Sequence, residues 1–88
     1  MKHDFLLTAS TPDGHAFLGR ASRLTLKGMQ GEITILSHHA PLICPVLAGR
    51  CRMTLENGEE IAAEMSEGIL SVKGDDVTLL CQSFVISN

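Results

Sequence analysis

Apolar residues recur at every second position along most of this chain, in short runs separated by turn-forming residues. Residues 50–66 give the clearest example, because two alternating segments flank Asn57-Gly58. Successive side chains of an extended chain point to opposite sides, so this pattern predicts strands that bury one face. Asn-Gly predicts a two-residue type I′ turn, because both residues tolerate a positive φ angle.

Turn signals divide the remainder of the chain into further short strands. Pro45 lacks an N–H group, so the strand that contains it is expected at a sheet edge or a bulge. Strands at this spacing predict an all-β fold, a small antiparallel β-sandwich or flattened barrel of about ten short strands. We expect a single domain that spans residues 1–88. The expected strands are 4–10, 16–18, 21–27, 32–36, one resuming near 42, the two arms of 50–66, 68–72, 77–82 and 84–86.

The composition excludes several classes of function. Seven Lys and Arg against ten Asp and Glu give a net charge of −3, which argues against nucleic-acid binding. No apolar run approaches the ~20 residues that span a bilayer, and the N-terminal apolar stretch is too short for a signal peptide. Three irregularly spaced cysteines fit a reducing compartment better than a disulfide scaffold, and Cys51 and Cys81 fall on apolar strand positions as small core residues.

A second hypothesis is a small enzyme or metal-binding sandwich centred on His38, His39 and Cys44. These residue types are zinc ligands, and Ser37 or Cys44 beside a histidine is a conceivable nucleophile pair. However, the chain has no paired ligand spacing, and adjacent histidines on an extended chain point apart. We therefore expect neither a catalytic residue nor a metal site.

The polar residues Glu32, His38 and His39 lie beside apolar surface, and we expect them to cluster at one end of the strands. Solvated loop residues would explain them equally well. The functional alternative is a docking loop, in which Ala40, Pro41 and Leu42 supply a rigid apolar contact.

The segment Gly28-Met-Gln-Gly-Glu-Ile-Thr-Ile-Leu-Ser-His-His-Ala-Pro-Leu resembles the signature of the F-type ATP synthase epsilon subunit. In that family, Gly-x-x-Gly-Glu leads through an apolar strand into Pro-Gly-His-Ala-Pro-Leu. The resemblance covers essentially the whole chain, as an ordered series of motifs. The further matching segments are Thr11-Pro-Asp-Gly, Gly19-Arg-Ala-Ser-Arg-Leu, Leu55-Glu-Asn-Gly-Glu-Glu, Gly68-Ile-Leu-Ser-Val and Val77-Thr-Leu-Leu.

This resemblance implies the N-terminal β-sandwich of a non-catalytic rotor subunit with no cofactor. It also implies that the domain joins the gamma subunit to the membrane c-ring, so that ion flow is coupled to ATP synthesis. The location would be the cytoplasmic face of a bacterial-type energy-coupling membrane, reached through the complex and not by insertion into the bilayer. The gamma-facing residues stay unplaced, and the implied c-ring contacts are Glu32, Ser37, His38, His39, Ala40, Pro41 and Leu42.

The chain departs from the family pattern in three places and in length. Ser37-His38 stands where the family has Pro-Gly, Thr34 stands at a usual glycine, and Glu67-Gly68 replaces Gly-Gly. Family members usually continue into two C-terminal helices, which bind nucleotide in some species and restrain ATP hydrolysis. With 88 residues, this chain is expected to lack that helical hairpin and both of its activities.

Overall fold

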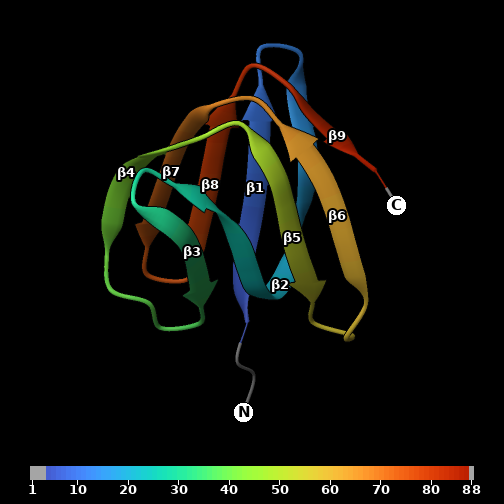
Figure 1. Ribbon diagram of the computed structural model, residues 1–88. Helices are drawn as coiled ribbons and strands as arrows, with labels where there is room; N and C mark the ends of the chain where they lie inside the picture. Colours follow the sequence, from blue (N-terminus) through green and yellow to red (C-terminus); the bar gives the residue numbers. More distant parts are fainter. Residues whose placement is uncertain (1–3, 88) are drawn as a thin grey trace.

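Nine β-strands and the turns between them make up residues 4–87, which are the residues that this computed structural model describes (Figure 1). The all-β prediction is confirmed, with nine strands in place of about ten. Within residues 4–87, no helix is long and apolar enough to cross a membrane. The strands are β1 (Phe5–Thr11), β2 (Gly14–Gly28), β3 (Gly31–Leu36), β4 (Leu42–Val46), β5 (Gly49–Leu55), β6 (Glu60–Met65), β7 (Gly68–Lys73), β8 (Asp76–Cys81) and β9 (Phe84–Ile86).

Strand β2 takes part in both layers of the sandwich, which is why the predicted strands 16–18 and 21–27 are one. Its first half pairs with β1, and its second half pairs with β3 and β5. The pairing with β5 shifts between Ala21 and Arg23, so Ser22 is an extra residue that bends the strand. The shift also changes which residues of β2 point into the core. Ala21 and Leu24 are both fully buried, whereas Ser22 is half-buried.

One layer is formed by β4, β7, β8, β1 and the first half of β2, and the other by β3, the second half of β2, β5, β6 and β9. All pairings are antiparallel except that of β1 with β8, which is parallel. Strand β4 pairs along its length with β7 but meets β2 only at Gly28 and Val46. The prediction that Pro45 lies at a sheet edge is therefore confirmed.

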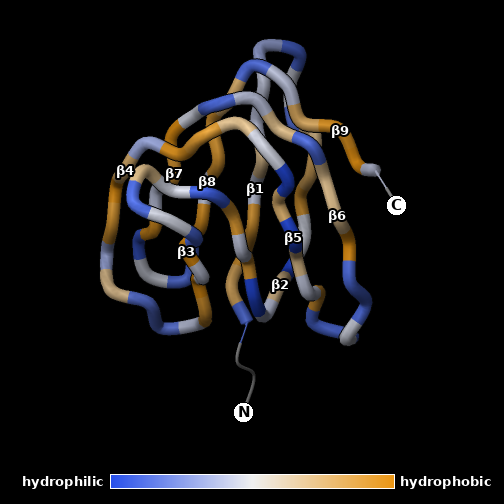
Figure 2. Tube along the Cα trace, in the orientation of Figure 1, coloured by the Kyte–Doolittle hydropathy of each residue, from blue (hydrophilic) through white to orange (hydrophobic). Residues whose placement is uncertain are grey.

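The space between the layers is filled by aliphatic side chains, methionines and two phenylalanines. Figure 2 shows the resulting alternation of hydrophobic and hydrophilic residues along the strands. Cys51 is fully buried and Cys81 is 8% exposed, which confirms that both are core residues. Burial raises the pKa of the Cys51 thiol to about 12, so it stays protonated and unreactive at neutral pH. The largest fully buried residues are Phe5, Leu7, Leu24, Leu26, Ile35, Val46, Cys51, Met53, Leu70, Val77 and Leu79.

The turn between β5 and β6 is not the predicted type I′ turn. Only Gly58 has a positive φ there, of 90°, whereas a type I′ turn requires positive φ at Asn57 as well. The Gly58 amide donates to the carbonyl of Leu55 at 2.9 Å, and the Asn57 side chain accepts from the Glu59 amide at 2.9 Å. The loop is thus two residues longer than predicted. Asn57 keeps a negative φ, and its side chain closes the loop through the hydrogen bond from Glu59.

Gly68 opens β7 at a point where the backbone of β8 leaves no room for a side chain. A Cβ atom added there would overlap the carbonyl oxygen of Leu80 and lie 2.9 Å from the Cβ of Cys81. The second glycine of the family's Gly-Gly is thus present at a point where the two strands lie too close for a side chain.

We expect Gly68→Ala to lower the free energy of unfolding by roughly 1–3 kcal/mol, because the two backbones must separate to admit the methyl group. Denaturant unfolding measures this, and Ser71→Ala on the same strand serves as the control, with a change within about 0.5 kcal/mol. Equal stability of the Gly68→Ala variant and the parent would contradict the close approach.

Candidate docking surfaces

The loop between β3 and β4 follows a tight turn that requires a left-handed residue. His38 has a φ of 64° and is the only non-glycine residue with positive φ among residues 4–87. That conformation costs an ordinary residue roughly 1–2 kcal/mol and costs glycine almost nothing. The glycine that the family has at this position suits the left-handed conformation. This chain adopts that conformation with a histidine.

His39 and its neighbours form a stiff projection next to this turn. The Nδ1 atom of His39 lies 2.7 Å from the carbonyl oxygen of Ala40, to which its N–H donates in that tautomer. Ala40 and Pro41 are exposed, whereas Leu42 is half-buried and packs against the core. The loop thus presents small apolar groups, and the proline ring fixes φ at Pro41.

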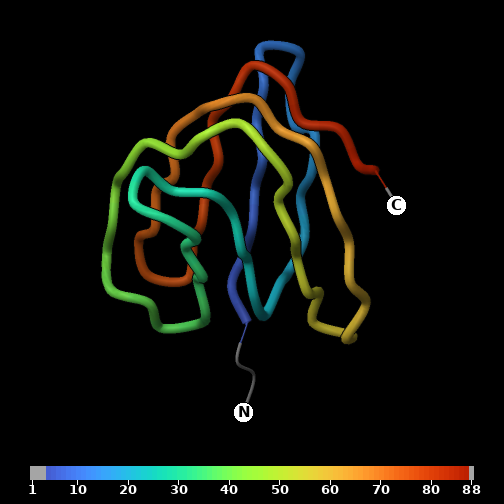
Figure 3. Tube along the Cα trace, in the orientation of Figure 1, coloured from blue at the N-terminus to red at the C-terminus, as the bar shows by residue number. Residues whose placement is uncertain are grey.

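Glu32 does not join this loop, so the expected cluster of Glu32, His38 and His39 is wrong. Glu32 is the second residue of β3, beside the β2–β3 hairpin, and Ser37 follows the last residue of the same strand. Five residues of extended chain separate the two positions by roughly 16 Å. Figure 3 shows the hairpin and the loop at opposite ends of β3. Glu32 and His38 are close in sequence, but they lie far apart in space because β3 is extended.

The residues of the alternative hypothesis are not assembled as a metal site. Cys44 lies on β4 and is packed against the core, whereas His38 and His39 lie in the loop. Among the described residues, no three His, Cys, Asp or Glu side chains are placed to hold a metal ion together.

A largely uncharged surface covers the outer side of β4, β7 and β8, and we call it the β4–β8 face. Pro45, Ile69 and Leu80 are register partners across these strands, and Ile43 lies beside them with 77% of its surface exposed. Among the described residues, charges occur on these strands only at their ends, at Lys73 and Asp76. The outward residues that define the β4–β8 face are Ile43, Pro45, Ile69, Ser71, Thr78 and Leu80.

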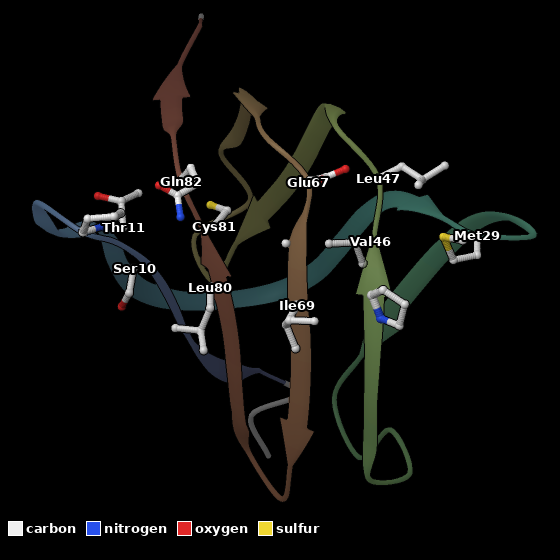
Figure 4. Close-up of a pocket in the computed structure, with 13 residues that line it drawn as sticks. Ser10, Thr11, Met29, Val46, Leu47, Glu67, Ile69, Leu80, Cys81 and Gln82 are labelled. Carbon is white, nitrogen blue, oxygen red and sulfur yellow. The ribbon is translucent and has the colours of Figure 1, made fainter.

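A groove of about 720 Å³ crosses one end of the β4–β8 face. Figure 4 shows Leu80 and Ile69 side by side within it, and Met29 of the β2–β3 hairpin at its far end. Exposed aliphatic side chains beside one another on neighbouring strands form the kind of patch that marks a protein interface. Sequence analysis missed this face because Ile43, Ile69 and Leu80 sit in short alternating strands, where one isolated outward apolar residue carries no signal.

The opposite outer surface carries charged residues along its strands, and we call it the charged face. Arg52 pairs with Glu32 at 3.1 Å, and Arg50 pairs with Glu64 at 3.3 Å. All four side chains are more than half exposed, so these ion pairs add little to stability. The two sides of the sandwich therefore differ in chemistry: one is apolar and the other is solvated. The residues of the charged face are Arg23, Lys27, Glu32, Arg50, Arg52, Glu60 and Glu64.

Comparison with known proteins matches this sandwich to one family. A family model described as "ATP synthase, Delta/Epsilon chain, beta-sandwich domain" matches residues 5–87. Among curated relatives, the ATP synthase epsilon chain of Brevibacillus brevis is 34% identical over 73 residues, which is 83% of this chain and 55% of that protein. The epsilon chain of Clostridium kluyveri is 36% identical over 75 residues, which is 85% of this chain and 57% of that protein. The chain thus spans about half the length of the curated relatives it matches.

Two solved structures share the fold. A chain of the Euglena gracilis mitochondrial ATP synthase superposes with a TM-score of 0.88 at 19% identity, over 94% of this chain and 53% of that one. A chain of the Tetrahymena thermophila mitochondrial ATP synthase central stalk and c-ring superposes with a TM-score of 0.77 at 15% identity, over 94% of this chain and 66% of that one. At these identities, the likeness concerns the fold alone.

The left-handed conformation of His38 predicts a difference in stability between two substitutions at this position. Both His38→Gly and His38→Ala remove the imidazole, so their difference isolates the backbone. We expect the glycine variant to be about 1 kcal/mol more stable than the alanine variant in thermal or denaturant unfolding.

The same pair of substitutions at His39 provides the control. His39 has no positive φ, so glycine should there be less stable than alanine by roughly 0.5–1 kcal/mol. The same sign at both positions would show that His38 is not held in the left-handed region in solution.

Proposed function

The chain belongs to the family of ATP synthase delta/epsilon chains, of which it carries the beta-sandwich domain, and from this we propose that it is a non-catalytic rotor subunit. In this role it links the gamma subunit of the central stalk to the membrane c-ring. It thereby couples ion flow to ATP synthesis, at the cytoplasmic face of a bacterial-type energy-coupling membrane. Its contribution is mechanical, since a rigid sandwich that holds two partners passes torque between them.

The observation that carries this proposal is the contrast between the two outer faces. We assign gamma to the β4–β8 face, because a stable interface buries an uncharged centre and leaves charges at its rim. Aliphatic contact must dominate, since the chain has three Phe and no Trp or Tyr. Ile43, with 77% of its surface exposed, has the most apolar area to lose to a partner.

We assign the c-ring to the loop Ser37–Leu42, at one end of the sandwich. Its exposed residues Ala40 and Pro41 give a small apolar contact, in which the proline ring fixes φ. A preorganised loop loses little conformational entropy when it binds, which favours a firm seat on a rotating partner.

We assign Glu32 to the same contact, with the ring extending along the length of β3. Its carboxylate is exposed and paired with Arg52, so it is available at the rim of such an interface. The described residues form strands and turns, and the function that we propose for them is coupling.

An acidic substitution on the β4–β8 face tests the gamma assignment. We expect Ile43→Asp to weaken binding to the gamma subunit at least tenfold, because a buried carboxylate without a partner costs more than about 1.4 kcal/mol. Ile43 is exposed in the free chain, so the variant should fold normally, which circular dichroism verifies.

Arg23→Asp on the charged face is the matched control and should bind gamma within about threefold of the parent. Binding is measured by surface plasmon resonance with the immobilised gamma subunit. Weakened binding of Arg23→Asp with intact binding of Ile43→Asp would move the gamma interface to the other side of the sandwich.

A substitution in the loop separates the two partners. Pro41→Asp should keep gamma binding and lose ATP-driven ion pumping in vesicles that carry the reassembled enzyme, since the loop no longer seats on the ring. Retained pumping with Pro41→Asp would place the ring contact outside this loop.

A further inference from the structure

A second cavity, of about 660 Å³, lies on the charged face between the β2–β3 hairpin and β5. It shares Met29 and Leu47 with the groove at the end of the β4–β8 face, but none of the residues that define that face lines it. Of the proposed c-ring contacts, only Glu32 borders it. The residues that line it are Leu26, Lys27, Gly28, Met29, Gly31, Glu32, Leu47, Arg50 and Arg52.

Three cations converge on this cavity although the chain as a whole is acidic. Lys27, Arg50 and Arg52 are three of only seven Lys and Arg in a chain of net charge −3. The Lys27 side chain reaches over Gly49, since a Cβ atom added at Gly49 would lie 3.6 Å from both Cε and Nζ of Lys27. The Lys27 ammonium group thus lies close to Gly49, the residue before Arg50.

The neighbouring carboxylates neutralise these cations only in part. Arg52 pairs with Glu32, and Arg50 pairs with Glu64, which lies outside the cavity lining. Lys27 makes no ion pair with any described residue. The lining holds three cations and one carboxylate, so the free protein has a surplus of positive charge at a concave site.

We propose that this cavity binds the phosphate group of a small soluble anion. The ammonium of Lys27 supplies a compact charge, and the guanidinium groups of Arg50 and Arg52 supply planar forks that match phosphate oxygens. Both arginine ion pairs are exposed and weak, so each arginine exchanges a carboxylate oxygen for a phosphate oxygen at small cost. Gly49 suits this position because its φ of 150° is one that residues with a side chain rarely adopt.

The effect of Glu32 on binding distinguishes a specific phosphate site from general charge attraction. Its carboxylate borders the cavity and holds Arg52, so it both repels an anion and occupies one donor. Glu32→Gln should therefore bind phosphate more tightly than the parent. Glu60→Gln makes the same change of net charge on the same face, outside the lining, and should leave the affinity almost unchanged.

The test is a titration of the full chain with inorganic phosphate and with pyrophosphate at constant ionic strength, followed by amide chemical shifts in NMR. We expect saturable shifts at Gly28, Gly31 and Gly49, with tighter binding of pyrophosphate. Lys27→Ala and Arg50→Gln should each weaken binding about five- to tenfold, whereas Arg23→Gln, which removes a cation outside the lining, should not.

Equal weakening by Lys27→Ala and Arg23→Gln, or equal tightening by Glu32→Gln and Glu60→Gln, would overturn the proposal in favour of diffuse charge attraction. Binding to phosphatidylglycerol vesicles without shifts from soluble phosphate would overturn it in favour of a lipid headgroup. Lys27 lines neither the β4–β8 face nor its groove, so Lys27→Ala should keep gamma binding, and the failure of either proposal leaves the other standing.

Discussion

The bend of β2 at Ser22 is the constraint on which the remainder of this structure depends. The extra residue turns a single strand from one layer into the other, so both sheets share a covalent backbone. The two layers consequently cannot slide over one another without breaking the ladders that β2 makes with β1, β3 and β5. For a domain proposed to transmit torque between two partners, this shared strand supplies stiffness that a small core alone would not.

The sharing of β2 also fixes which surfaces face away from each other. The β4–β8 face is the outer side of the layer that contains β1 and β8, and the charged face is the outer side of the other layer. Burial of the apolar side chains of the β4–β8 face against a partner lowers the free energy. Burial of the paired charges on the charged face costs their hydration. The division of chemistry between the two faces, more than any single residue, supports a docking role.

Sequence reasoning was successful where one local rule decided the outcome. The alternation around Cys51 and Met53 predicted their burial, and the missing N–H of Pro45 predicted an edge strand. It failed where the geometry depended on distant parts of the chain. The bulge at Ser22 arises from pairing with β5, and a period-two pattern on β2 alone does not contain it. Glu32 was grouped with His39 because they are close in sequence, although β3 holds them apart. The β4–β8 face required the register of three strands, which no single segment reveals.

The central claim is that a gamma-type partner covers the β4–β8 face, and methyl cross-saturation NMR tests it most directly. The labelled chain is bound to unlabelled gamma subunit, whose protons are saturated, and the loss of each methyl signal is recorded. The account predicts strong losses at Ile43, Ile69 and Leu80, and little at Leu36, an exposed apolar residue of β3 whose neighbour across the strand is Arg23 of the charged face. Strong loss at Leu36 with unchanged signals from Ile43 and Ile69 would contradict it.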